Sequence, residues 1–138
     1  MKTVIQLCIL FFFGISNISA NDFREVKQIS LKKDELIKIL VKYGQTEKLF
    51  KFRWTLYVNN GLVIHRSYDR IVGQNILNLN HKNQSFRVEL KSRGSDNYNV
   101  PYILVKFKEF KYDTKEAVFD ILLSDEKLQI ELKYLNNV

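Results

Sequence analysis

The stretch that decides the fold spans residues 49–70 and reads LFKFRWTLYVNNGLVIHRSYDR. Apolar and polar residues alternate along two runs, and Asn59-Asn60-Gly61 lies between them. Alternation with a period of two is typical of a strand with one buried face, and an Asn-Gly pair is a strong signal for a hairpin turn. We therefore predict a β-hairpin at the centre of an all-β domain.

The register of this hairpin is predicted from the pairing that keeps apolar residues together. A two-residue turn at Asn60-Gly61 would place Leu56 opposite His65. A three-residue loop at residues 59–61, with its glycine in the left-handed conformation, pairs apolar residues instead. Arg66 would then lie opposite Trp54 as the one charge on the apolar face. The other members of that face would be Phe50, Phe52, Leu56, Val58, Leu62, Ile64 and Tyr68.

Further strands are expected along the rest of the chain. Residues 36–43 (LIKILVKY) fit either a helix or a strand, and their alternation and β-branched side chains favour a strand. Short strands separated by turns are typical of a sandwich or a barrel. The other expected strands, besides the two arms of the hairpin, are residues 25–31, 71–79, 86–91, 102–112, 117–123 and 128–135.

The fold class predicted from these strands is an all-β antiparallel sandwich of about eight or nine strands, immunoglobulin-like. The alternative is a small closed β-barrel. The last three strands, between residues 102 and 135, are expected to form a meander because their turns are short.

The first 20 residues have the layout of a cleavable signal peptide. Lys2 precedes an apolar run at residues 4–13, and small or polar residues follow as far as Ala20. The run is shorter than the roughly 20 apolar residues that span a bilayer, so no transmembrane segment is expected after cleavage. Residues 21–138 would form one domain of 138 − 20 = 118 residues, periplasmic or secreted.

Charge and cysteine content restrict the partners. Cys8 is the only cysteine and lies in the predicted signal peptide, so no disulfide or thiolate site is expected. Removal of Lys2 leaves a formal charge of 21 − 15 = +6, spread along the strands. This pattern is typical of a solvated sheet face, and it also suits an anionic lipid or glycan surface or an envelope protein. Because the chain is expected to be exported, no nucleic-acid partner is predicted.

Catalytic and metal-binding patterns are weak. His65 and His81 belong to no cluster with metal-ligand spacing. His65, Ser67 and Asp69 alternate along one strand, so their side chains would lie roughly 7 Å apart rather than in a hydrogen-bonded triad. We therefore expect no enzyme, no metal and no cofactor.

Two groups of residues are candidates for ligand or partner binding. Cations beside aromatic rings can hold carboxylates, phosphates or sugars. The competing interpretation places the aromatic rings in the core. The first group lies on the hairpin and contains Arg53, Trp54, Arg66, Tyr68, Asp69 and Arg70. The second lies in the irregular stretch after residue 92 and contains Arg93, Asp96 and Tyr98.

The expected function is that of an exported, non-enzymatic binding or accessory protein of the bacterial envelope. Its sandwich surface would bind a protein or an anionic envelope component. One alternative is a carrier of a small apolar or anionic ligand, which would need an internal cavity lined by aromatic side chains. Another is a hydrolase with an unrecognised site, which would need polar residues that converge in one pocket.

Overall fold

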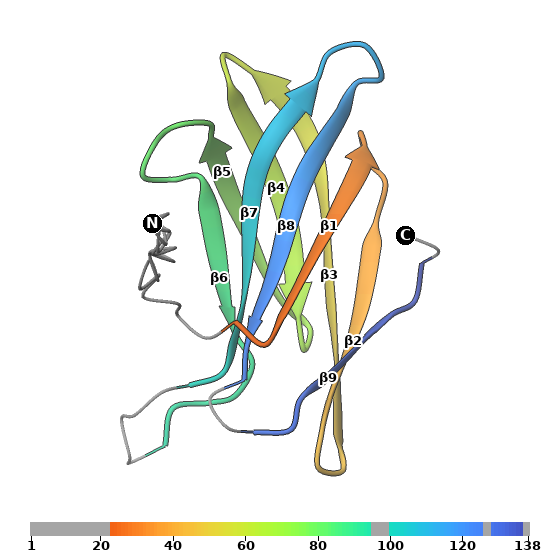
Figure 1. Ribbon diagram of the computed structural model, residues 1–138, viewed down its shortest axis with the longest axis vertical. Helices are drawn as coiled ribbons and strands as arrows, with labels where there is room; N and C mark the ends of the chain where they lie inside the picture. The colour runs from red at the N-terminus through yellow and green to blue at the C-terminus, as the bar shows by residue number, and fades with distance from the viewer. Residues whose placement is uncertain (1–22, 95–99, 126–127, 137–138) are drawn as a thin grey trace, which may run out of the picture.

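The computed structural model describes residues 23–94, 100–125 and 128–136. Nine strands form two antiparallel sheets that pack face to face (Figure 1). The predicted all-β sandwich is therefore confirmed. Among the described strands no pairing joins the two sheets, so the alternative closed barrel is not formed. The signal peptide predicted at residues 1–20 lies outside the described residues.

The two sheets contain four and five strands. The four-stranded sheet has the order β1 (Glu25–Lys32), β8 (Glu116–Ser124), β7 (Tyr102–Lys111) and β6 (Ser85–Glu89). The five-stranded sheet has the order β5 (Ile71–Asn78), β4 (Gly61–Tyr68), β3 (Thr46–Val58), β2 (Ile37–Tyr43) and β9 (Glu131–Tyr134). The sandwich is immunoglobulin-like in that two antiparallel sheets pack together. Within each sheet, most neighbouring strands are also consecutive in sequence.

The last strand differs from its prediction. β9 is shorter than the expected strand at residues 128–135, and it pairs with β2 rather than with β8. The reason is that β1 pairs with β8 along its whole length, from Glu25 opposite Leu123 to Lys32 opposite Glu116. Since β7 holds the other edge of β8, the chain crosses to the five-stranded sheet. The predicted meander of three C-terminal strands is therefore wrong in its last member.

The core lies between the sheets and is rich in phenylalanine. The centroid of the Phe52 ring lies 5.6 Å from that of Phe50, 6.0 Å from that of Phe86 and 5.4 Å from that of Phe119. Full burial of such a ring stabilises the fold by about 1.5–3 kcal/mol. The strand prediction for residues 36–43 is confirmed by β2, whose β-branched side chains alternate into this core.

The turn of the central hairpin is shorter than predicted. Asn59 and Asn60 form a two-residue turn with φ of 51° and 61°, and Gly61 is the first residue of β4 opposite Val58. Asparagine tolerates the left-handed conformation, so the turn needs no glycine. The predicted register is therefore wrong: Ile64, not Arg66, lies opposite Trp54.

A bulge in β3 changes which residues reach the core. The register shifts between Trp54 and Leu56, so Leu56 becomes 50% exposed and Tyr57 turns inward. The Tyr57 ring stacks on Phe110 of the facing sheet, with centroids 4.0 Å apart. β7 has its own register shift just before Phe110. The two bulges thus bring these rings together. The predicted inward positions of Leu56 and Val58 are wrong, because both side chains are exposed, Val58 to 54%.

Candidate basic groove

The outer face of the five-stranded sheet carries a shallow basic groove formed by Lys51, Arg53, His65, Ser67 and Arg70. Two hollows of about 280 and 300 Å³ lie side by side there, and both include Lys51 and Ser67 in their linings. Arg53 and His65 line one hollow, and Arg70 lines the other. The groove therefore gathers three cationic side chains and two hydrogen-bonding groups.

Strand alternation explains why these side chains lie together. Phe50 and Phe52 point into the core, so Lys51 and Arg53 point to solvent. The pairing of β3 with β4 then sets Lys51 opposite Ser67 and Arg53 opposite His65. The groove is thus a direct product of the hairpin register.

Among the residues that the structure describes, the cations that define the groove have no ion-pair partner, because the two carboxylates that line the hollow of Arg70, Glu47 and Asp69, pair with Lys42 and Lys48. Lys51 lies opposite Lys38 of β2, and like charges in such a pair destabilise a sheet by about 0.2–1 kcal/mol. Lys133 of β9 extends the same face, opposite Leu40. Across the described part of the chain, no ion pair includes Lys38, Lys51, Arg53, Arg70 or Lys133. The face therefore presents cations that remain available to an anion.

Trp54 and Tyr68 are structural residues of the core. Trp54 is buried, and its Nε1–H donates to the main-chain oxygen of Leu31 at 2.8 Å. The hydroxyl of Tyr68 donates to the oxygen of Leu90 at 2.6 Å, and burial raises the pKa of this hydroxyl. Neither ring reaches the groove, so the structure separates them from the cations with which they were predicted to act.

Arg66 lies at the seam between β4, β5 and β6 rather than against Trp54. Its Nε donates to Oδ1 of Asn75 at 2.6 Å, and its guanidinium carbon lies 5.5 Å from the centroid of the Phe86 ring. Partial burial lowers the pKa of this guanidinium. Gly73 makes room for it, because a Cβ at Gly73 would lie 3.1 Å from that carbon. The one charge predicted on the apolar face is therefore half-buried and held by an amide and a ring.

The remaining predicted residues are already paired or lie elsewhere. Asp69 lines the same hollow as Arg70, and it forms an ion pair with Lys48 at 3.3 Å. Arg93 is paired with Glu89, and this contact lowers the pKa of the Glu89 carboxyl. Asp96 and Tyr98 lie outside the described residues.

Lys51, His65 and Ser67 were not predicted as members of a site. The signal for them in the sequence is the polar parity of the hairpin, which places alternate residues on one outer face. The predicted set instead combined cations with Trp54 and Tyr68, whose rings belong to the opposite parity.

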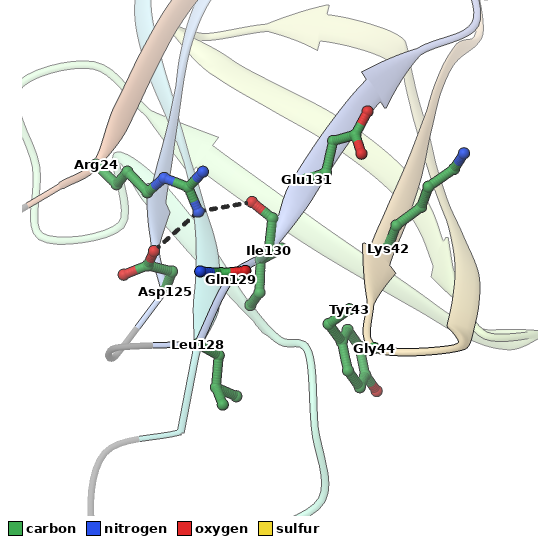
Figure 2. Close-up of a pocket in the computed structure, with 9 residues that line it drawn as sticks. All are labelled: Arg24, Lys42, Tyr43, Gly44, Asp125, Leu128, Gln129, Ile130 and Glu131. Atoms are coloured by element: carbon green, nitrogen blue, oxygen red, sulfur yellow. Dashed lines mark hydrogen bonds and ion pairs between the residues drawn. The ribbon is translucent and has the colours of Figure 1, made fainter.

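A third hollow, apart from the two of the groove, lies where the chain crosses to β9 (Figure 2). It measures about 810 Å³. Arg24 lies at its side, and Nη1 donates to the Asp125 carboxylate at 3.0 Å and to the main-chain oxygen of Ile130 at 2.9 Å. The charge of Arg24 is therefore already neutralised, which makes this hollow a weaker anion site than the groove.

The described residues contain no cluster of His, Cys, Asp or Glu that could hold a metal ion. Nor do they form a helix long and apolar enough to cross a membrane. Comparison with protein-family models, with curated proteins and with solved structures finds no match to the chain.

Proposed function

We propose that the protein is an exported, non-enzymatic binding protein that holds an anionic component of the bacterial envelope in the basic groove. The observation that carries the proposal is the set of groove cations, Lys51, Arg53 and Arg70, without a carboxylate partner in the described chain. Exposed cations of one sign attract anions and speed their association. A periplasmic or secreted location follows from the signal peptide predicted at residues 1–20.

The chemistry of the groove suits phosphate or carboxylate groups. An arginine guanidinium can donate two parallel hydrogen bonds to either group, and a lysine adds a compact charge. Ser67 offers a hydroxyl on the same face. Lys38 and Lys133 continue the positive charge across β2 and β9. A polyanion, such as a lipid surface or a charged glycan, would use this extended face better than a single small anion.

A carrier of a small ligand is the second candidate, and the hollow beside Arg24 favours it. A ligand there would have to compete with the Asp125 carboxylate for the guanidinium. The phenylalanine rings that would line an internal cavity contact one another instead. For these reasons the groove is preferred. The hydrolase remains an untested prediction. The residues directly opposite His65 on the two neighbouring strands are Arg53 and Gln74, and neither is a carboxylate.

The proposal is tested by reversing two groove charges, Lys51→Glu and Arg53→Glu, in one chain. Sedimentation with vesicles of phosphatidylglycerol, and titration with a carboxylated polysaccharide, measure the affinity for both sources of anion. Loss of two cations near an anionic surface costs about 2 kcal/mol, and the two new carboxylates add repulsion, so affinity should fall at least roughly thirtyfold. Wild-type affinity should also fall as salt is added.

The matched control is the double variant Lys82→Glu and Lys115→Glu, which makes the same change in net charge at two exposed loop positions. It should bind nearly as well as the wild type. Equal losses in both double variants would mean that net charge alone drives binding, and an unchanged affinity of the groove variant would refute the site.

A further inference from the structure

The free edge of β5 differs from the other sheet edges. Strands β1, β6, β5 and β9 form the four edges of the two sheets (Figure 1). Of the nine described strands, β5 alone has no Asp, Glu, Lys or Arg. Charged residues are a common means by which proteins prevent edge strands from pairing. β5 lacks that protection over eight residues, although the chain as a whole carries a formal charge of +7.

The outward side chains of β5 are apolar and strongly exposed. Val72 is 81% exposed and Ile76 is 56% exposed. Both lie on the outer face, opposite Ser67 and Val63 of β4. Ile71, at the start of the strand, is 74% exposed. Apolar exposure along an uncharged edge is typical of a surface that another strand covers.

The main chain of β5 has unused hydrogen-bonding groups on this edge. Tyr68 and Ile71 close the two-residue turn between β4 and β5, so alternate residues starting with Ile71 bond to β4. The groups of Val72, Gln74 and Ile76 therefore point away from β4. Asn78 has the same parity, and its N–H donates outward to the oxygen of Asn83 at 3.0 Å. Among the described residues, no main-chain group forms a hydrogen bond with Val72, Gln74 or Ile76 on the edge that faces away from β4.

The sequence of β5 is self-complementary about Gln74. If a second β5 pairs antiparallel across this edge with Gln74 on the two-fold axis, Val72 faces Ile76 of the other copy on the outer face. On the inner face Ile71 faces Leu77, and Gly73 faces Asn75. The groups that point outward are those that this register joins, in about six main-chain hydrogen bonds. The two Gln74 amides can also donate and accept between themselves.

We propose that two copies of this chain associate through β5, with Gln74 at the two-fold axis. The pairing joins two five-stranded sheets into one continuous sheet and sets both basic grooves on its outer face. An interface of one strand pair is small, so the dimer forms and dissociates with protein concentration. Added salt strengthens it, because salt screens the repulsion between two positively charged chains.

The test is sedimentation velocity of the wild type and of two variants, Gln74→Lys and Gln74→Glu, over roughly two decades of concentration. Each variant places two like charges on the axis and should raise the dissociation constant about tenfold or more. An equimolar mixture of the two variants should restore the dimer, because opposite charges then meet. Circular dichroism shows whether the variants are folded.

The matched control is Gln28→Lys, which makes the same substitution at an exposed glutamine of the β1 edge. It should dimerise like the wild type. A monomeric wild type at every concentration, a dimer that survives Gln74→Lys, or a mixture that stays monomeric would each overturn the proposal. These outcomes can be distinguished from those of anion binding, although Val72 borders the groove, since salt strengthens this dimer and weakens the binding of anions.

Discussion

At the scale of single residues, two aromatic side chains use their polar atoms to join the sheets. Trp54 of β3 donates to Leu31 of β1, and Tyr68 of β4 donates to Leu90 beyond β6. Each bond runs from the five-stranded sheet to the four-stranded sheet or the segment that follows it. The two residues that resembled parts of a ligand site are therefore connections within the sandwich.

The substitution Trp54→Phe tests this role. It removes the donor to Leu31 and leaves that carbonyl without this partner, while a ring remains to pack against Phe110. The free energy of unfolding should fall by about 1–3 kcal/mol. Urea unfolding followed by circular dichroism measures it, since the only tryptophan is lost. Unchanged stability would show that the bond contributes nothing. Affinity for anions should be unchanged, because the side chain lies inside.

At the scale of elements, the turn between β4 and β5 sets an arginine in an unfavourable conformation. Asp69 and Arg70 have φ of 48° and 68°. A left-handed conformation costs an ordinary L-residue about 1–2 kcal/mol, which glycine avoids. Strained residues of this kind are frequent at functional sites, and Arg70 lines the basic groove.

The substitution Arg70→Gly should therefore change stability and binding in opposite directions. The free energy of unfolding should rise by about 0.5–1 kcal/mol as the strain is relieved. Affinity for phosphatidylglycerol vesicles should fall, because one groove cation is lost. Asn60→Gly, in the β3–β4 turn at the other end of β4, is the control and should leave binding intact. A fall in stability for Arg70→Gly would contradict the idea of strain.

At the scale of the whole molecule, buried tyrosines link stability to alkaline pH. Burial and the hydrogen bond to Tyr112 raise the pKa of Tyr57 from 10.0 to about 12. Burial also raises the pKa of Tyr68 and Tyr134. The unfolded chain therefore loses these protons at lower pH than the folded chain does, and deprotonation favours unfolding.

The free energy of unfolding should accordingly stay level from neutral pH to pH 10 and decrease as the pH rises from 10 to 12. Denaturant titrations at a series of pH values measure this decrease. Tyr57→Phe removes one of the titrating groups and should make it shallower. A decrease of the same steepness in that variant would exclude Tyr57 as a contributor.

Much of the architecture could be predicted from local patterns. Alternation identified the strands, and it placed Phe50, Phe52 and Ile64 correctly in the core. The register of the hairpin was not predicted, because the turn that forms, Asn59-Asn60, is neither the Asn60-Gly61 turn nor the three-residue loop at residues 59–61. The register also contains a bulge between Trp54 and Leu56, and the contact of Tyr57 with Phe110 that accompanies it spans the two sheets.

The positions of the candidate site residues could be predicted only in part, and their role in binding stays a prediction. Arg53 and Arg70 line the groove, whereas Trp54 and Tyr68 face the core. The difference is one of parity, since the two sets alternate along the same strands. Lys38 and Lys133 could not be assigned to this face from sequence, because their approach depends on how β2 and β9 pair.

The sequence of residues 49–70 by itself determined that this segment folds as a hairpin with one buried face, because alternation and turn signals act over a few neighbouring residues. Tertiary structure alone decided the bulge, the crossing of β9 and the gathering of the groove cations. Each of these depends on contacts between segments far apart in the chain, so no local pattern encodes them. The hairpin that organises the core thus also carries, on its other face, the surface proposed to bind.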